Sequence, residues 1–429
     1  MASSIAEFVL THPIFCHHNH HFDFRDFEAQ RTTHDFRGLL GYAESDLVTA
    51  AGTRAVSGVT EAERVAALWP KIRTTGYGRA VTLGCRALFG LEYGPQTFDQ
   101  VTKALQEAFV GRSAREVYDY FVREKANTKW VIKDWYASSS GEVAPGESLY
   151  PDYYRFTWRG DAFFSIVDRG PVEELESGSD RSILTLEQFV AALHASIDAF
   201  RRQASLAAIK VGMAYQRDLM VGNPTRHEAE VAFSRINSPT LFRAGIQQHS
   251  GAVSAVEGRA LSDYLFHKVM EKAQDEDIPV QIHTGYLAGN WGSLLGTKAS
   301  HLIPVFDRYR RVRFDVFHGS WPWMSELGAI AKNYPNVYPD LCWAWTMNPA
   351  ESERALSEWL DAVPFNKIFG YGADTGWPWG DVGYSLQARI GIARVLEQKV
   401  EAGYFSRATA EEVASALMLR NGEEFYGLA

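Results

Sequence analysis

Four histidines fall within five residues near the start of the chain, in the stretch FCHHNHHFD from Phe15 to Asp23. Successive side chains of an extended strand point to opposite faces, so His18 and His20 would lie on the same face. Imidazole nitrogens are ligands that zinc and other transition metals prefer. This spacing predicts one strand that supplies two ligands to a single metal ion. The flanking His17 and His21 are expected to point away, where they would pack or form hydrogen bonds.

Three further residues that can bind a metal or transfer a proton stand at the ends of later apolar runs. His283 follows IPVQI, His318 follows VRFDVF, and Asp374 closes NKIFGYGAD. Each one alone has an ordinary explanation, because a buried histidine is usually hydrogen-bonded and an aspartate often caps a helix. The combination predicts one metal site, with the ligands His18, His20, His283 and Asp374.

The elements that must position these residues alternate between strand-like and helix-like segments. The strand-like runs lie at 13–20, 128–136, 153–167, 206–213, 278–285, 312–319, 336–343 and 366–374. Helical patterns separate the later runs, which is typical of a parallel sheet with crossover helices. About eight such units predict an α/β fold of the (β/α)8 TIM-barrel type, with the active site at the carboxyl ends of the strands. A doubly wound open sheet is the alternative that periodicity leaves open.

The chain is longer than a barrel requires, because it has 429 residues and such barrels typically need about 250. Residues 44–126 carry helical patterns, including EAERVAALWPKIR, and no convincing strand. We therefore expect a single barrel domain, 1–429, with a helical insertion at 44–126, after the first strand.

Bulk composition excludes several classes of protein. The formal net charge is −9, with basic residues spread along the chain, which argues against binding to nucleic acid or to an acidic membrane. Three cysteines cannot form a disulfide framework, so a reducing compartment is expected. The N-terminal segment lacks the pattern of a signal peptide. These features predict a cytoplasmic protein whose partner is a small-molecule substrate.

The complete set of motifs resembles the amidohydrolase superfamily of metal-dependent barrels. That pattern places HxH on the first strand, histidines on the fifth and sixth and aspartate on the eighth, and the matching residues here are His18, His20, His283, His318 and Asp374. The phrases YPNVYPDLCWAW and VPFNKIFGYGADTGW look most like the uronate isomerase-like branch. The block IHTG…HLIPVFDRY…FHGSWPW is also similar to the decarboxylase and lactonase branch. One departure is Cys16, because the superfamily often has aspartate at that position.

The resemblance implies a metal-dependent hydrolase that uses a metal-activated water on an amide, lactone or related carbonyl of a small polar, aromatic or sugar-derived substrate. Asp374 would hold the metal and transfer the proton, and His318 would polarise the carbonyl or act as a second acid–base group. Zn²⁺ is favoured over Mn²⁺ or Fe²⁺, and one ion over two. The alternatives are a uronate isomerase-like sugar-acid isomerase, a metal-dependent decarboxylase and a catalytically inactive ligand-binding barrel. His318 favours hydrolysis or decarboxylation, because the isomerases generally lack that histidine.

Further residues are candidates for contact with the substrate or with a second metal. Lys210 in LAAIKVGM would either be carboxylated and bridge two metals or bind a substrate carboxylate. Arg217 is a candidate anion-binding residue. Aromatic walls at the strand ends would suit sugar rings or aromatic substrates, and the candidates are Trp291, Trp321, Trp343 and Trp377. The resemblance also implies a homo-oligomer, since such assemblies are frequent in the superfamily.

Overall fold

The computed structural model describes residues 4–52, 60–135, 148–178, 182–237, 242–243, 246–247 and 252–428. Within these residues the main sheet holds seven parallel strands in the order β1-β2-β3-β4-β7-β8-β9. Their bounds are β1 (Ile14–Asn19), β2 (Thr128–Trp135), β3 (Tyr154–Arg159), β4 (Leu206–Val211), β7 (Val280–Ile282), β8 (Phe314–Val316) and β9 (Val337–Pro339). A separate antiparallel pair is made by β5 (Phe242–Arg243) and β6 (Ile246–Gln247). The predicted α/β class with a parallel sheet is confirmed.

Helices connect the successive strands, as parallel pairing requires. The connections after β3 are α10 (Leu186–Gln203), α12 (Ala255–Asp275), α13 (Ile303–Arg308), α14 (Met324–Asn333) and α16 (Pro349–Ala362). Other helices are α1 (Ile5–Thr11), α8 (Asp161–Phe164), α9 (Gly170–Ser177), α11 (Arg226–Ile236) and α15 (Ala344–Met347). The chain finishes with α17 (Gly380–Glu401), α18 (Arg407–Ser415) and α19 (Asn421–Tyr426). None of the described helices combines the length and the apolar character needed to cross a membrane.

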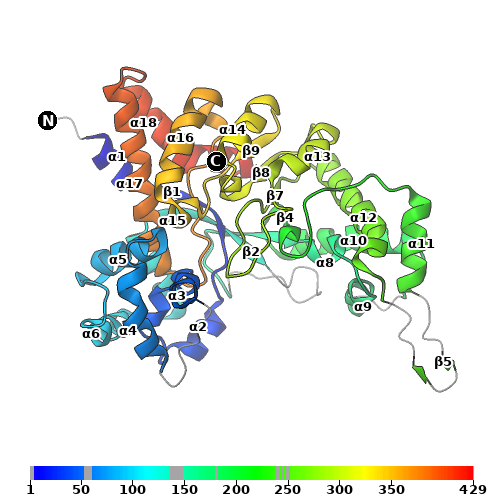
Figure 1. Cartoon of the computed structure of the whole chain (residues 1–429), viewed down its shortest axis with the longest axis horizontal. Coiled ribbons are helices and arrows are strands. Elements are labelled where there is room, and N and C mark those ends of the chain that lie inside the picture. The colour runs from blue at the N-terminus through cyan, green and yellow to red at the C-terminus, as the bar shows by residue number, and fades with distance from the viewer. Residues whose placement is uncertain are drawn as a thin grey trace.

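Helices fill the described part of the chain between β1 and β2. They are α2 (Phe24–Gln30), α3 (Ala43–Ala51), α4 (Glu61–Ile72), α5 (Gly76–Phe89), α6 (Phe98–Glu107) and α7 (Ala114–Tyr118). Figure 1 shows α3 to α6 gathered at one end of the molecule, next to α17. A Cβ atom on Gly383 of α17 would lie 2.1 Å from the carbonyl oxygen of Ala80 in α5. Glycine is therefore needed at Gly383, because the two helix backbones approach each other too closely for a side chain.

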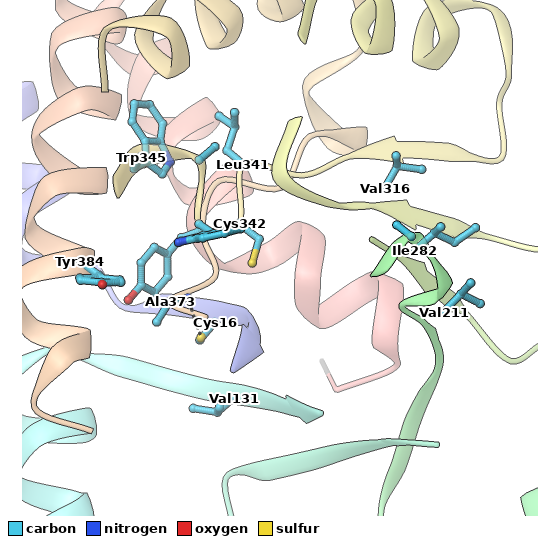
Figure 2. Packing of buried hydrophobic residues seen from close by; sticks show 14 of the residues in the cluster. Cys16, Val131, Val211, Ile282, Val316, Leu341, Cys342, Trp345, Ala373 and Tyr384 are labelled. Atoms are coloured by element: carbon cyan, nitrogen blue, oxygen red, sulfur yellow. Dashed lines mark hydrogen bonds between the residues drawn. The ribbon is translucent and has the colours of Figure 1, made fainter. Parts of the chain in front are cut away.

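Two rows of side chains cross the strands β4, β7 and β8. One row of paired positions holds Lys210, Gln281 and Asp315, and the next holds Val211, Ile282 and Val316. Successive residues of a strand point to opposite faces, so one face of this part of the sheet is polar and the other apolar. Figure 2 shows the three apolar side chains next to one another. The polar face lies on the concave side of the sheet. There Gln281 Nε2 donates a hydrogen bond to the hydroxyl of Tyr426 in α19, and this hydroxyl donates to Asp315 Oδ2.

The sheet is curled rather than flat. The Nε2 group of Gln281 on β7 donates a hydrogen bond to the carbonyl oxygen of His17 on β1 at 2.9 Å. In the strand order β1 and β7 are separated by β2, β3 and β4. Only a curled sheet brings these two strands within hydrogen-bonding distance of each other.

Several predicted strands are longer than the observed elements, because β7, β8 and β9 have three residues each where the sequence predicts strands at 278–285, 312–319 and 336–343. Two further predicted strands differ more. The predicted strand at 153–167 is shorter, because β3 ends at Arg159 and α8 follows. The predicted strand at 366–374 is not a regular strand, and it makes one isolated parallel bridge through Phe369. This segment still bonds on both sides, since the amide of Phe369 donates to the carbonyl oxygen of Pro339 in β9 and the amide of His17 on β1 donates to that of Tyr371, each at 3.0 Å. The backbone leaves the extended conformation at Asp374, where φ is +56°, so a regular ladder cannot continue.

Candidate metal centre and cavity

Three donor atoms converge at the ends of β1 and of the 366–374 segment. His18 Nε2 lies 3.1 Å from His20 Nε2, and Asp374 Oδ1 lies 3.7 Å from the first nitrogen and 3.0 Å from the second. Ligands held about 2.0–2.2 Å from a tetrahedral zinc ion lie roughly 3.4 Å from one another. The spacing of the three atoms therefore fits a metal ion bound between them.

Local backbone structure explains why these side chains meet. His18 lies in β1 and His20 directly after it, two positions apart, so both rings leave the chain on the same side. The amide of Asp374 donates to the carbonyl oxygen of His18 at 3.0 Å, which holds the carboxylate next to the two rings. Asp374 is one of the few residues other than glycine with a positive φ, a conformation that is common at functional sites.

The neighbouring histidines take the structural roles expected of them. The ring of His17 stacks on Phe369 with 4.2 Å between the centroids. His21 pairs with the hydroxyl of Tyr154 at 2.5 Å and with the carboxylate of Asp381 at 3.0 Å. Both rings are fully buried, and neither belongs to the group formed by His18, His20 and Asp374. The prediction that His17 packs and His21 forms hydrogen bonds is confirmed.

The protonation states of the converging groups suit a cation. Burial, followed by the positive charge of Lys210, lowers the pKa of His18 well below its usual value. Burial alone would raise the pKa of Asp374, but the hydrogen bond and charge of His20, with the charges of His318 and Lys210, lower it below its usual value. The His18 ring is therefore neutral and Asp374 is ionised near neutral pH, and these are the forms that bind metals.

A second pair of nitrogens next to this group is also arranged for a cation. His318 Nδ1 lies 3.0 Å from the carbonyl oxygen of Cys342, and His283 Nε2 lies 2.8 Å from that of Tyr286. A carbonyl oxygen only accepts hydrogen bonds, so these nitrogens carry the ring protons. His283 Nδ1 and His318 Nε2 are then both acceptors, and they face each other at 3.0 Å. Burial lowers the pKa of His318 to about 4 and that of His283 well below its usual value, so an extra proton does not join them near neutral pH.

Asp374 connects the two sets of donor atoms. Its Oδ2 atom lies 3.9 Å from His318 Nε2, and His318, Cys342 and Asp374 form a second group with metal-binding spacing. A third group with such spacing among the described residues is His17, Asp315 and Asp340. The predicted ligand His283 belongs to none of the three groups and contacts the site through His318. Lys210 lies among these atoms, because its Nζ is 3.4 Å from His18 Nε2 and 3.9 Å from the centroid of the Phe317 ring.

Three charged residues near His20 were not predicted from the sequence. Asp134 is the last residue but one of β2, Arg159 ends β3, and the two side chains form an ion pair that also includes Asp161. Asp134 Oδ2 lies 3.9 Å from His20 Nδ1. Burial raises the pKa of Asp134, but the charges of Arg159 and Lys210 outweigh it and hold that pKa at about 2. An ionised carboxylate therefore lies beside the His20 ring, and it could have been found because Asp134 lies two residues before the end of the predicted strand at 128–136.

A cavity of about 600 Å³ opens beside the metal centre. This volume falls within the range of about 300–1,000 Å³ that is typical of small-molecule sites. The lining residues are His20, His21, Phe22, Asp23, Arg25, Asp26, Gly41, Tyr42, Lys133, Trp135, Tyr150, Thr375, Gly376 and Tyr384. His20 thus connects the three donor atoms to a space that can hold a substrate.

The residues predicted to contact the substrate do not line this cavity. Trp343 is buried against His318, with 5.2 Å between the ring centroids, and Trp291 is 92% exposed. Trp321 packs on Tyr286 and Trp377 on Phe22. Arg217 is ion-paired to Asp263 at 2.6 Å, so its charge is already compensated. An aromatic residue at a strand end can turn toward the cavity or toward neighbouring side chains, and at these positions packing decides.

Tyr42, which precedes α3, connects the helices after β1 to the metal centre. Its hydroxyl donates to Asp374 Oδ1 at 3.3 Å, and its ring packs on Trp343 at 4.6 Å and lines the cavity. We expect Tyr42→Phe to lower kcat by about tenfold, since a hydrogen bond to a charged group contributes about 1.5–3 kcal/mol. The metal content should stay at the wild-type value, because no ligand atom is removed. Steady-state kinetics with metal analysis would check this, and an unchanged kcat would contradict it.

The fold is shared with solved structures that cover nearly all of this chain. A uronate isomerase from Thermotoga maritima superposes with a TM-score of 0.78 at 14% identity, over 98% of this chain and 96% of that one. A glucuronate isomerase from Caulobacter crescentus gives 0.74 at 16% identity, over 99% and 93%. A protein assigned as a metal-dependent hydrolase from Lactobacillus casei gives 0.66 at 14% identity, over 100% and 98%. Identities this low show a common fold and nothing about the reaction.

Sequence comparison adds one curated relative and one family. Protein fluG of Emericella nidulans is 25% identical over 278 residues, which are 61% of this chain and 30% of that protein. The chain therefore matches less than a third of the length of that relative. The family model described as amidohydrolase matches residues 244–428, the part of the chain that holds His283, His318 and Asp374. The resemblance to the amidohydrolases that the sequence predicted is thus confirmed over residues 244–428.

Proposed function

We propose that this protein is a metal-dependent hydrolase that adds water to an amide, lactone or related carbonyl of a small substrate. The observation that carries the proposal is the convergence of His18 Nε2, His20 Nε2 and Asp374 Oδ1 within 3.7 Å of one another at the wall of a substrate-sized cavity. A buried carboxylate beside the neutral rings of His18 and His318 has little use without a cation, because its charge is costly to bury unpaired. The same carboxylate can also take up a proton.

Zinc is the proposed metal, since two imidazole nitrogens and one carboxylate oxygen are typical zinc ligands. Mn²⁺ and Fe²⁺ are the alternatives, because they accept the same donor atoms. A divalent ion at this centre supplies Lewis acidity, which polarises a carbonyl and acidifies water. The three-atom group supports one ion, as the sequence favoured. The facing nitrogens of His283 and His318 offer a position for a second, so the ion count has to be measured.

The residues of the chain have distinct roles in the proposed reaction. Asp374 is ionised and can accept the proton of the attacking water, and Tyr42 keeps its carboxylate in position. His318 is neutral, with Nδ1 bonded to the carbonyl of Cys342, so its Nε2 atom is an acceptor directed at the centre. Asp134 lies beside the other face of His20 and orients that ring.

We further infer that the sheet closes into the predicted (β/α)8 barrel. The 366–374 segment would be the eighth element, since its backbone hydrogen bonds reach β9 on one side and β1 on the other. The helices α3 to α7 would then form the insertion predicted at 44–126. Closure would put all the strand ends in one ring, and this arrangement is typical of barrels with catalytic sites at the strand ends.

Product analysis on a substrate panel tests the proposed reaction. The metal-loaded protein is incubated with lactones, amides, aromatic carboxylates and uronates. A hydrolase releases acid without gas, a decarboxylase releases carbon dioxide, and an isomerase gives a product of unchanged mass. Acid release that depends on the metal would support the proposal. Isomerisation or gas release alone, or no turnover of any class by the metal-loaded protein, would contradict it.

A further inference from the structure

A buried lysine on β2 lies next to the cavity and is not used by the proposed reaction. Lys133 is 4% exposed, and it lines the same cavity as His20. Its Nζ atom donates to the carbonyl oxygen of Asp134 at 2.6 Å. Among the described residues, no carboxylate oxygen lies within the 4.0 Å of an ion pair with Nζ. Buried charges are normally paired, so an ammonium without a paired carboxylate in the wall of a cavity requires an explanation.

Aromatic rings surround the remaining part of this ammonium. Nζ lies 5.2 Å from the ring centroid of Trp135 and 5.4 Å from that of Tyr150. The faces of aromatic rings attract cations, but they do not accept strong hydrogen bonds. An ammonium has three N–H groups. The carbonyl of Asp134 takes one, and an anion in the cavity could accept from another.

The charges around Lys133 leave it available for an anion. Burial lowers the pKa of Lys133 to about 8, and the negative charges of Asp134, Asp23 and Asp26 act in the opposite direction. Asp134 is already paired with Arg159. Asp23 caps helix α2 and is ion-paired to Arg25 at 2.8 Å. These carboxylates do not contact the Lys133 ammonium. A ligand anion that reached Nζ would therefore be the group that compensates its charge.

The lysine and the metal centre lie on neighbouring strands that border one cavity. Lys133 on β2 is the pairing partner of Asn19 on β1, the residue between His18 and His20. Five aromatic side chains line this cavity together with the charged residues Asp23, Arg25 and Asp26, and the aromatic ones are Phe22, Tyr42, Trp135, Tyr150 and Tyr384. A molecule with a flat or apolar body could therefore contact His20 and Lys133 at the same time.

We propose that Lys133 binds a carboxylate of the substrate, while the carbonyl that reacts lies at the His20 end of the cavity. This inference rests on the proposed hydrolase function for the identity of the reacting group. The binding of the anion itself does not depend on the metal, because its partner would be the ammonium of Lys133 and not the metal ion. The substrate class is then a small carboxylic acid that also carries an amide, lactone or related carbonyl.

A matched pair of probes tests the lysine directly. 3-Phenylpropionate and 3-phenylpropanamide have nearly the same shape and differ in charge, and calorimetry gives their Kd with the metal-loaded protein. Wild type should bind the carboxylate at least about tenfold more tightly than the amide. Lys133→Gln should lose this preference, while Lys133→Arg should retain most of it, because arginine keeps the charge. Binding of the neutral amide should change by less than about threefold in both variants.

A second buried lysine provides the control. Burial also lowers the pKa of Lys367 to about 8, but its Nζ is bonded to the carbonyl oxygens of Ala331 and Tyr334 and does not line this cavity. Lys367→Gln should leave the preference for the carboxylate unchanged. A preference that survives in Lys133→Gln, or that is absent from the wild type, would overturn the proposal.

The measurement is repeated after removal of divalent metals with a chelator. A carboxylate can bind a metal ion directly, and the metal-free protein removes that contribution. A preference that persists without metal and disappears in Lys133→Gln supports the lysine site even if no hydrolysis is found. If the preference for the carboxylate probe is lost when the metal is removed, the carboxylate binds at the metal centre. That result would overturn the role of Lys133.

Discussion

Replacement of Asp374 by asparagine should remove most of the divalent metal from the purified protein and lower kcat/KM by at least about 10³-fold. Asp374 Oδ1 lies beside His18 and His20, and Asp374 Oδ2 lies on the side of His318. Asp374 therefore belongs both to the group with His18 and His20 and to the group with His318 and Cys342. Asparagine has nearly the same shape but lacks the negative charge. A metal contributes several kcal/mol to the stabilisation of a transition state, and each 1.36 kcal/mol corresponds to a factor of ten in rate.

Metal analysis of variants at three histidines separates one ion from two. His20→Asn should remove the ion of the first group. If the protein binds one ion, His283→Asn should leave the metal content unchanged. If it binds two, this variant should lower the metal content from about two ions per chain to about one. The control is His227→Asn, which changes an exposed histidine of α11. Full metal content in both Asp374→Asn and His20→Asn would place the metal elsewhere and contradict the proposed centre.

The positions of the five motif residues followed from strand order alone. The carboxyl ends of parallel strands meet at one edge, so residues that end separate strands can approach each other in space. His18, His283 and His318 lie at or just after the ends of β1, β7 and β8, and Asp374 lies beside β1. Placing these residues at the strand ends required no knowledge of how the loops fold, so the sequence pattern was sufficient for that step.

Residues contributed by loops, or by the side-chain direction on a strand, could not be placed in the same way. Tyr42 is more than twenty positions from the end of β1, and its contact with Asp374 depends on how the segment before α3 folds back. Lys133 has a charged neighbour, Asp134, on the same strand. Alternation assigns the two to opposite faces, but it does not say which face borders a cavity. Asp134 itself, at a strand end, was within reach of the rule that found the histidines.

The segment 366–374 shows a limit of pattern analysis of another kind. The run NKIFGYGAD at 366–374 has the composition of a strand, and its backbone bonds to both neighbours. It is nevertheless irregular, because the positive φ of Asp374 directs the carboxylate toward His20. At Asp374 the geometry of the candidate metal centre outweighs the local preference for an extended backbone, and amino-acid composition cannot reveal this.

Below the metal centre, a pair of buried acids should make the stability of the protein depend on pH in an unusual direction. Asp315 and Asp340 are fully buried, and one oxygen of each lies within 4.8 Å of the other and of a ring nitrogen of His17. Tyr426 donates to Asp315 Oδ2 at 2.5 Å, and the amide of Cys342 donates to Asp340 Oδ1 at 2.7 Å. Burial raises the pKa of Asp315 to about 7, and burial together with the charge of Asp315 raises that of Asp340 well above its usual value. The pair thus holds a proton near neutral pH.

The sign of the pH dependence follows from these directions. In the unfolded chain Asp315 has a pKa of about 3.9, so between pH 4 and 7 the folded protein binds a proton that the unfolded chain has lost. The stabilisation from this proton is complete below about pH 4 and is lost as the pH rises toward 7. A shift of about three pKa units corresponds to about 4 kcal/mol. Carboxylates with lowered pKa values, such as Asp134, act in the opposite direction.

Asp315→Asn should remove this dependence. The amide oxygen can still accept from Tyr426, and the amide N–H can donate to Asp340 in place of the shared proton. We expect the free energy of unfolding of the variant, minus that of the wild type, to rise by up to about 4 kcal/mol between about pH 4 and pH 7. Urea unfolding at several pH values measures this difference, in which the contributions of groups that do not interact with Asp315 cancel. The control Asp275→Asn, at an exposed position of α12, should give a flat difference. A flat or falling difference for Asp315→Asn would mean that Asp315 is ionised inside the sheet. The positive charge of Lys210 would then stabilise the ionised carboxylate.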